Sequence, residues 1–352
     1  MMGRATNNGW ISGGGRSVVR EILRDSPFYW AILAYAFLVT ATAFAIGHPG
    51  KLIPFAYLGR WLTGVAIVAT IYVSFLGIRC LGTETPLSDF RRKIALVTSP
   101  NRMAGFMLFF WLAIFHGVFT SAKTMLSDIA PFTLDVYFAD LDAALHGGDP
   151  WQLLPMVPLI TLAVQWLYLP VWFMVLAGIS LYATMIAPRD LRNRYVWTFM
   201  LCWVVLGNVV ALLGMSAGPA FYEQVTGSPR FSPLIDYLSF TGGTFYGTAD
   251  IQAMLWDKYA EGRSDVGSGI SAFPSLHLAM VTLWALMGWK IRAWIGYTLS
   301  CYALIILIGS VHLGWHYAVD GYFSIIAAAA IWKFVGAVQS ITAPRPMAAE
   351  IA

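Results

Sequence analysis

The sequence predicts an all-α membrane protein, a bundle of about eight transmembrane helices. Apolar residues make up 58% of the chain and charged residues only 11%, whereas a soluble domain has roughly a quarter of its residues charged. The apolar residues also form runs long enough to cross ~30 Å of hydrocarbon. This composition excludes an ordinary soluble enzyme, and we expect no nucleic-acid partner.

Eight apolar segments are predicted to span the membrane. The fourth contains Pro170, which a membrane helix tolerates as a kink. The sixth has about 15 residues and would be only ~22 Å long, so we expect its outer end at the level of the lipid headgroups. The segments lie at about 27–46, 61–79, 103–125, 160–186, 195–215, 275–289, 293–312 and 317–338.

The positive charges predict the orientation of the bundle. Sixteen of the 22 Lys and Arg residues fall in the two termini and in alternate connections, and six fall in the connections between them. Cytoplasmic segments carry the excess of positive charge in membrane proteins. Both termini are therefore predicted to be cytoplasmic. No sorting signal or signal peptide is evident, which favours a bacterial inner membrane.

These expectations divide the chain into four parts. Residues 1–26 are a cytoplasmic tail, residues 27–102 hold two extra spans and a basic inner loop, residues 103–338 form a six-helix core, and residues 339–352 are a second cytoplasmic tail. The core includes two long outer stretches, at about 126–159 and 216–274. The first has the apolar spacing of an amphipathic helix on the membrane face, followed by a Gly-Gly-Asp-Pro turn.

Three of the six histidines lie at the predicted outer ends of the last three spans. His277 follows Pro274 at the start of the sixth span, and His312 and His316 precede the eighth. The i, i+4 spacing places His316 and Asp320 on one helical face, with His312 on the same side if the helix extends back. Two helix N-termini would face one spot, which favours an anion.

Phosphoryl transfer suits such a site. An imidazole can attack phosphorus, a carboxylate can orient it, and a second histidine can protonate the leaving oxygen. We expect no cofactor and no metal ion. A zinc site made by His312, His316 and Asp320 is an alternative, but it leaves His277 unexplained. The cysteines show no metal spacing, and the simplest interpretation of His116 and His146 is structural.

Three segments resemble the motifs of the type-2 phosphatidic acid phosphatase superfamily, whose members are integral membrane enzymes. The second motif, Ser-x5-Pro-Ser-Gly-His, is matched by Ser268, Pro274, Ser275 and His277, with Leu276 in place of glycine. The third motif, Ser-Arg-x5-His-x3-Asp, is matched by His316 and Asp320, with Gly309 and Ser310 in place of serine and arginine. The first motif, Lys-x6-Arg-Pro, is matched by Lys123 and Pro131, with Ala130 in place of arginine.

Both motif arginines are thus absent. The sequence Phe-Pro-Ser-Leu-His is similar to that of the branch containing inositol phosphorylceramide synthases. The resemblance implies that His316 forms a phosphohistidine, Asp320 orients it and His277 is the general acid. It also implies that Lys123, Ser268 and Ser275 contact phosphate. We expect Arg263 or His312 to replace a missing arginine, although His312 could equally pack helix ends.

The resemblance implies a phosphotransferase that takes membrane lipids as phosphate donor and acceptor at the outer leaflet, facing the periplasm or exterior. Two alternatives remain open. The acceptor can be water, which would make the protein a lipid or polyprenyl phosphate phosphatase. The bundle can also be a non-enzymatic transporter or scaffold. The sequence leaves the lipid, the headgroup and the oligomeric state open.

Overall fold

The computed structural model describes residues 9–342, and parts of both predicted tails, residues 1–8 and 343–352, lie outside this range. The described residues contain helices and no strands, which confirms the all-α prediction. Seven helical stretches are long and apolar enough to cross a membrane: Ser26–Ala45, Leu58–Leu81, Pro100–Ile129, Pro158–Met185, Arg189–Leu213, Ala293–His312 and Ala318–Thr342. The protein is a multi-pass membrane protein.

The remaining predicted span, the sixth, is a shorter apolar helix, α14 (Leu276–Ile291), of 16 residues. At 1.5 Å per residue such a helix is ~24 Å long, which agrees with the expectation from the sequence. The predicted first tail includes a helix, α1 (Gly9–Arg24). The basic loop after the second span includes another helix, α4 (Pro86–Val97), and the predicted outer helix appears as α6 (Asp135–His146).

The chain divides into two compact units, which we describe separately. Within the described range, unit 1 comprises residues 9–131, 173–187 and 253–270, and unit 2 comprises residues 132–172, 188–252 and 271–342. The predicted six-helix core, residues 103–338, stays a prediction, since these units are defined by packing alone. Its first span, α5 (Pro100–Ile129), packs within unit 1.

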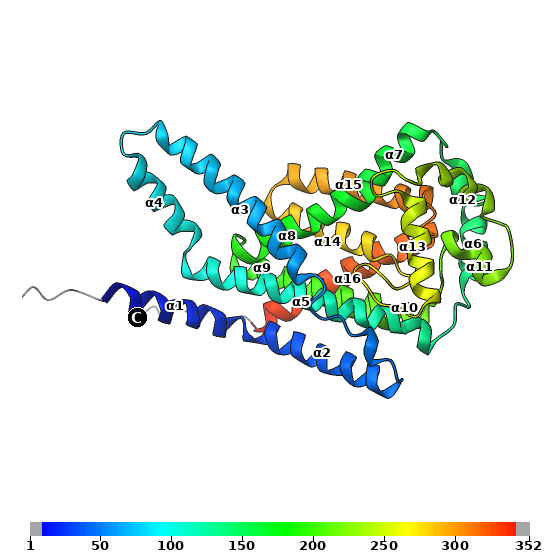
Figure 1. Ribbon diagram of the computed structural model, residues 1–352, viewed down its shortest axis with the longest axis horizontal. Helices are drawn as coiled ribbons and strands as arrows, with labels where there is room; N and C mark the ends of the chain where they lie inside the picture. The colour runs from blue at the N-terminus through cyan, green and yellow to red at the C-terminus, as the bar shows by residue number, and fades with distance from the viewer. Residues whose placement is uncertain (1–8, 343–352) are drawn as a thin grey trace, which may run out of the picture. The chain divides into compact units, whose positions relative to one another are not determined.

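Unit 1 is built around α5. Helices α1 and α2 (Ser26–Ala45) lie along it, and the segment that follows α2 is tied to it by polar contacts (Figure 1). The backbone N–H of Ile53 donates to Ser121 Oγ at 2.8 Å, and Lys51 Nζ donates to the Asp128 carboxylate at 2.6 Å. A side chain at Gly117 would collide with the carbonyl of Pro54, so glycine permits this close approach. The remaining helices of unit 1 are η1 (Pro49–Lys51), α3 (Leu58–Leu81), α4 and most of α8 (Trp172–Met185).

Unit 2 contains the last three helices as its packed centre. Helix α14 lies against both α15 (Ala293–His312) and α16 (Ala318–Thr342) (Figure 1). The fully buried side chains of α14 include Leu278, Met280 and Trp284. The other elements of unit 2 are α6, η2 (Pro150–Leu153), α7 (Pro158–Trp166), η3 (Leu167–Val171), α9 (Arg189–Leu201), η4 (Cys202–Val210), α10 (Ala211–Leu213), η5 (Pro219–Phe221), α11 (Tyr222–Thr226), α12 (Ser232–Leu238) and η6 (Ser239–Thr241). Helix α13 (Thr248–Ala260) begins in unit 2 and ends in unit 1.

Pro170 lies in a π-helical segment and not in a simple kink. Residues Leu167–Val171 form η3, a wider turn inserted between α7 and α8. Proline has no N–H and its ring clashes with the preceding turn, so a local change of helical register accommodates it. Widened turns of this kind are frequent at functional sites.

Candidate active site

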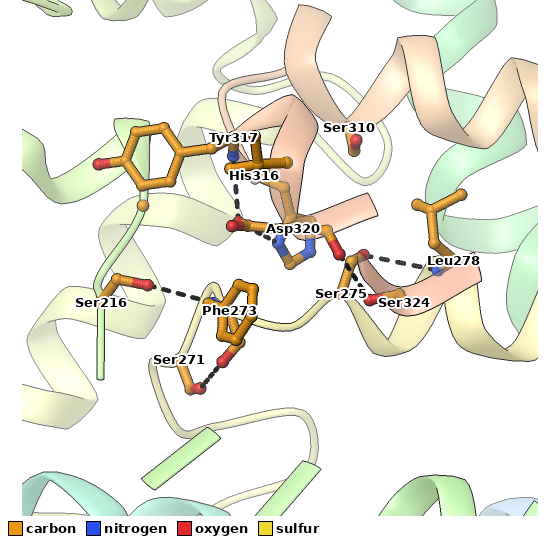
Figure 2. Close-up of polar contacts among 12 residues, drawn as sticks. Ser216, Ser271, Phe273, Ser275, Leu278, Ser310, His316, Tyr317, Asp320 and Ser324 are labelled. Atoms are coloured by element: carbon orange, nitrogen blue, oxygen red, sulfur yellow. Dashed lines mark hydrogen bonds and ion pairs between the residues drawn. The ribbon is translucent and has the colours of Figure 1, made fainter. Parts of the chain in front are cut away.

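His316 and Asp320 come together at the start of α16. Gly314, with φ +69, breaks the chain direction after α15, and the Ser310 carbonyl then accepts the N–H groups of Trp315 and His316 at 2.9 and 3.3 Å. His316 Nδ1 lies 3.3 Å from Asp320 Oδ2, as Figure 2 shows. Asp320 is fully buried and His316 is 8% exposed. This pairing directs Nε2 of His316 away from the carboxylate.

His277 lies in the first turn of α14, and its ring centroid is 6.5 Å from that of His316. Tyr168 stacks on the His277 ring at 4.5 Å with an interplanar angle of 13°, and Trp172 packs against it at 4.2 Å. Trp172 Nε1 also donates to the His277 carbonyl at 3.4 Å. The segment around Pro170 therefore supplies an aromatic wall for this imidazole.

Ser275 joins the beginnings of α14 and α16. It is the N-cap residue of α14, where its Oγ accepts the Leu278 N–H at 3.5 Å, and its own N–H donates to the Asp320 carbonyl at 3.4 Å (Figure 2). Serine is favoured at this position because its hydroxyl satisfies an amide that the helix cannot. The Ser275 hydroxyl is fully buried and keeps a proton that it can donate to a ligand oxygen.

The N-terminus of α16 is occupied by a carboxylate of the protein itself. Asp142, on α6, accepts the Ala318 N–H at 2.6 Å and the Val319 N–H at 2.9 Å. The Tyr317 N–H donates to Asp320 at 3.1 Å. The expectation that this helix end faces a phosphate is therefore wrong, because the amides that would bind it already have acceptors.

A second buried carboxylate on α6 holds the neighbouring loop. Asp135 accepts the N–H groups of Ala217 and Gly218 at 2.9 and 2.8 Å, and the Tyr317 hydroxyl at 2.8 Å. Burial raises the pKa of Asp135 and of Asp142, against the opposing effect of these hydrogen-bond donors. Helix α6 thus fixes the segment that carries His316.

Sequence reasoning missed both of these aspartates, because it placed them in the predicted outer stretch at about 126–159 without giving them a role. A usable signal existed. Asp135 and Asp142 are seven residues apart, on the same face of α6 as the apolar residues Phe138 and Ala139, and all four are buried. Carboxylates on the apolar face of a helix indicate buried hydrogen-bond partners, because an unpaired buried charge is costly.

His312 is the last residue of α15, and the helix of His316 does not extend back to it. The condition under which the two histidines would share a helical face is therefore not met, and Gly314, with φ +69, turns the chain between them. His312 Nε2 instead lies 2.8 Å from Thr161 Oγ1, which in turn lies 2.9 Å from the Tyr237 hydroxyl. Its role in phosphate binding stays a prediction.

Three other residues predicted to bind substrate lie in unit 1. The Ser268 hydroxyl closes a turn with the Asp265 backbone, and the following residue, Gly269, packs closely against Lys123. Arg263 pairs with Glu261 and lines a cavity of about 430 Å³ together with Gly47, His48, Gly50, Lys51, Gly262 and Ser264. Their substrate contacts stay predictions.

The two histidines interpreted as structural have protein partners. His116 Nδ1 lies 2.7 Å from the Leu112 carbonyl, and His146 Nε2 lies 2.9 Å from the Tyr322 hydroxyl. The zinc alternative finds no support. Among residues 9–342 no group of three or more His, Cys, Asp or Glu side chains has the arrangement of a metal site.

The two residues that depart from the third motif, Gly309 and Ser310, are both closely packed. A side chain at Gly309 would lie 2.8 Å from Val164 Cγ1, and Ser310 is fully buried with its hydroxyl donating to the Leu307 carbonyl. Position 310 therefore has no room for a solvated guanidinium.

A membrane-embedded helical bundle with two imidazoles and a carboxylate at one buried spot is the arrangement of a phosphoryl-transfer enzyme. The model of the PAP2 superfamily matches residues 137–334. This match covers more than half of the chain, and the protein belongs to that superfamily, as an enzyme of the phosphatidic acid phosphatase type acting on lipid phosphates. Searches of the curated proteins and of the solved structures find no match.

Proposed function

We propose that the protein is a lipid phosphotransferase similar to inositol phosphorylceramide synthase. It takes a phosphorylated headgroup from a donor lipid and passes it to the hydroxyl of an acceptor lipid, with His316 as the covalent carrier. The observation that carries the proposal is the pairing of His316 Nδ1 with the fully buried Asp320, 6.5 Å from the His277 ring.

The first step forms a bond between His316 and phosphorus. With a proton on Nδ1 donated to Asp320, the lone pair of His316 is on Nε2, which attacks the donor phosphate. The bond between phosphorus and the glycerol oxygen breaks, and His277 gives this oxygen a proton. Asp320 stabilises the positive charge that the His316 ring gains.

The second step reverses these roles. His277, now neutral, accepts the proton of the acceptor hydroxyl, whose oxygen attacks phosphorus. The bond between phosphorus and Nε2 breaks, and His316 returns to its neutral form. The product is the acceptor lipid carrying the phosphorylated headgroup. Ser275 and His312 are the proposed phosphate contacts in the unit that holds the two catalytic histidines, and the contacts of Lys123, Ser268 and Arg263 stay predictions from the sequence.

The apolar surroundings support a lipid acceptor over water. Phe138 stacks on Phe273 at 4.5 Å and packs against Tyr317 at 6.2 Å, next to the His316–Asp320 pair. A ring wall of this kind limits the access of water and provides surface for acyl or sphingoid chains. The positive-inside pattern supports a site at the outer leaflet, with both termini in the cytoplasm.

A transfer assay in proteoliposomes tests the proposal. Purified protein is reconstituted with phosphatidylinositol labelled in its phosphate, with and without ceramide or diacylglycerol as acceptor. We expect the label in a new lipid when acceptor is present, and no product from His316→Ala. If all of the label is released in water-soluble form despite the acceptor, water is the acceptor, the protein is a hydrolase and the transferase proposal fails.

Recovery of the covalent phosphohistidine intermediate is a second test of the proposal. Denaturation in alkali preserves a phosphorus–nitrogen bond to histidine, so labelled protein should be recovered from the wild type and not from His316→Ala. A non-enzymatic transporter or scaffold would give neither labelled protein nor product, and His316→Ala would leave its function intact.

A further inference from the structure

Two buried hydrogen-bond donors beside the histidines have no partner among the described residues. They are the Tyr168 hydroxyl and the Trp315 indole Nε1, and Tyr168 is only 1% exposed. Burying a polar group without a partner costs about 1–3 kcal/mol, so folded proteins satisfy most such groups. Two exceptions at one place indicate a ligand that completes their bonding.

Both donors belong to rings next to the two histidines. The Tyr168 ring stacks on His277, and its other neighbour is the Trp315 ring, parallel within 3° at a centroid distance of 6.5 Å. Trp315 directly precedes His316, and the Ser310 carbonyl fixes the backbone of both residues. The donors therefore belong to the same rigid arrangement as the proposed nucleophile and acid.

Tyr168 and Trp172 differ in how their hydrogen-bond donors are used. Both residues contact His277 from the region of the π-helical segment η3. Trp172 uses its N–H on the His277 carbonyl, whereas the Tyr168 hydroxyl bonds to no described residue. Tyr168 is therefore held in a fixed position and carries a hydroxyl that has no bond to the described residues. A ring without this hydroxyl would pack in the same way.

The charge of the site limits the kind of phosphate that fits. Ala130 and Ser310 occupy the positions of the two motif arginines, and Asp135, Asp142 and Asp320 are buried around His316. Neutral O–H and N–H donors suit a phosphate with one negative charge, as in a phosphodiester. A phosphomonoester, with nearly two charges at neutral pH, would require guanidinium or ammonium groups.

We propose that the Tyr168 hydroxyl and the Trp315 Nε1–H bind the non-bridging oxygens of the transferred phosphate, and that they select a phosphodiester over a phosphomonoester. This inference rests on the proposed function, because it assumes that the phosphoryl group is transferred at His316. It assigns to two neutral aromatic donors the contacts that arginines make elsewhere in the superfamily.

Tyr168→Phe tests the inference, because it removes one oxygen and keeps the ring stack. The readout is release of diacylglycerol from phosphatidylinositol, which occurs whether the acceptor is a lipid or water. We expect kcat/KM to fall about tenfold or more, with a similar rise in the inhibition constant of orthovanadate, a phosphate analogue. Trp315→Phe should weaken orthovanadate inhibition in the same way.

Thermal stability distinguishes this role from a structural one. Because the hydroxyl of Tyr168 has no protein partner, Tyr168→Phe should leave Tm unchanged or raise it. Tyr322→Phe is the control, since that hydroxyl already bonds to His146 at 2.9 Å, and it should keep orthovanadate inhibition within about twofold of wild type.

Three results would overturn the inference. Tyr168→Phe could retain wild-type kcat/KM and orthovanadate inhibition, or its loss of activity could be matched by a loss of Tm. Wild-type protein could also cleave phosphatidic acid faster than phosphatidylinositol at equal mole fraction. A failure to move label to an acceptor lipid would overturn the transferase proposal alone, because diacylglycerol release would still report on the two donors.

Discussion

The Asp142 carboxylate accepts the N–H of Ala318 at 2.6 Å, although 176 residues separate the two positions in the chain. This contact, together with that to Val319, caps the helix that begins two residues after His316. A helix on the outer side of the predicted bundle thereby sets the position of the proposed nucleophile. Several consequences can be measured.

Asp142→Asn should reduce both stability and turnover. The amide can accept only one of the two N–H groups and places its own N–H near the other, so we expect a loss of about 0.5–2 kcal/mol. Turnover should fall through kcat with little change in KM, because the loop of His316 loses its support while the lipid-binding surface is retained. Melting curves and kinetics in mixed micelles measure both effects.

Asp140→Asn is the matched control on the same helix. The Asp140 side chain is 65% exposed and contacts only Arg230 among the pairs described here. Its substitution should change stability by less than about 1 kcal/mol and leave kcat unaltered. Equal kcat losses in the two variants would contradict a specific role for the Asp142 cap.

The cost of Asp142→Asn should depend on pH. Burial raises the pKa of Asp142 above its ordinary value of 3.8, so the folded protein holds this proton more tightly than the unfolded chain does. The resulting stabilisation is present below pH 3.8 and is lost as the pH rises through the folded-state pKa. Asparagine has no such dependence. The substitution should therefore cost more at about pH 4.5 than at about pH 8, and a larger cost at high pH would contradict the shift.

His277→Ala should produce a loss that depends on the leaving group. A general acid contributes about 10²–10⁴-fold when the leaving oxygen needs a proton, as the glycerol oxygen of a lipid does. A nitrophenolate leaves without help, so the variant should lose less than about tenfold on a nitrophenyl phosphodiester. Rates on the two substrates measure this contrast. Equal losses would assign His277 to binding, and His316→Ala should abolish turnover of both substrates.

Arg230→Lys should destabilise the part of unit 2 around α6. The guanidinium donates to Asp149 through Nε and Nη2, and also to the Ala139 carbonyl at 3.1 Å. Asp149 is 10% exposed and Arg230 22%. An ammonium cannot make the two-pronged contact, so we expect a loss of about 1.5–3 kcal/mol. Thermal melts measure this loss. A Tm equal to that of wild type would show that the pair contributes nothing.

The spans were predictable because hydrocarbon imposes long apolar runs, and the structure has helices at all eight predicted positions. The relation between His316 and Asp320 was also predictable, since residues four apart meet on a helix. The contacts of His312 were not predictable, because the sequence left open whether the last helix extends back to it through Gly314. A glycine just beyond a helical pattern is a stop signal, and here it turns the chain.

Other parts of the site depend on contacts that no local pattern contains. The caps from Asp135 and Asp142 join segments about 80 to 180 residues apart. The stack of Tyr168 on His277 depends on how a proline-containing turn is accommodated, and the sequence alone permitted a simple kink. Tertiary packing determines long-range hydrogen bonds and helical register. The pattern of a single segment therefore does not predict them.

The close contact between Gly309 and Val164 limits how this chain can be converted into an ordinary member of its superfamily. Restoring serine at 309 would force Cβ against a stiff β-branched side chain, and restoring arginine at 310 would bury a charge where a hydroxyl now bonds to Leu307. Each reversion alone is therefore expected to be deleterious. Changes at 164, 309 and 310 would have to occur together, which makes the loss of the arginine hard to reverse by single mutations.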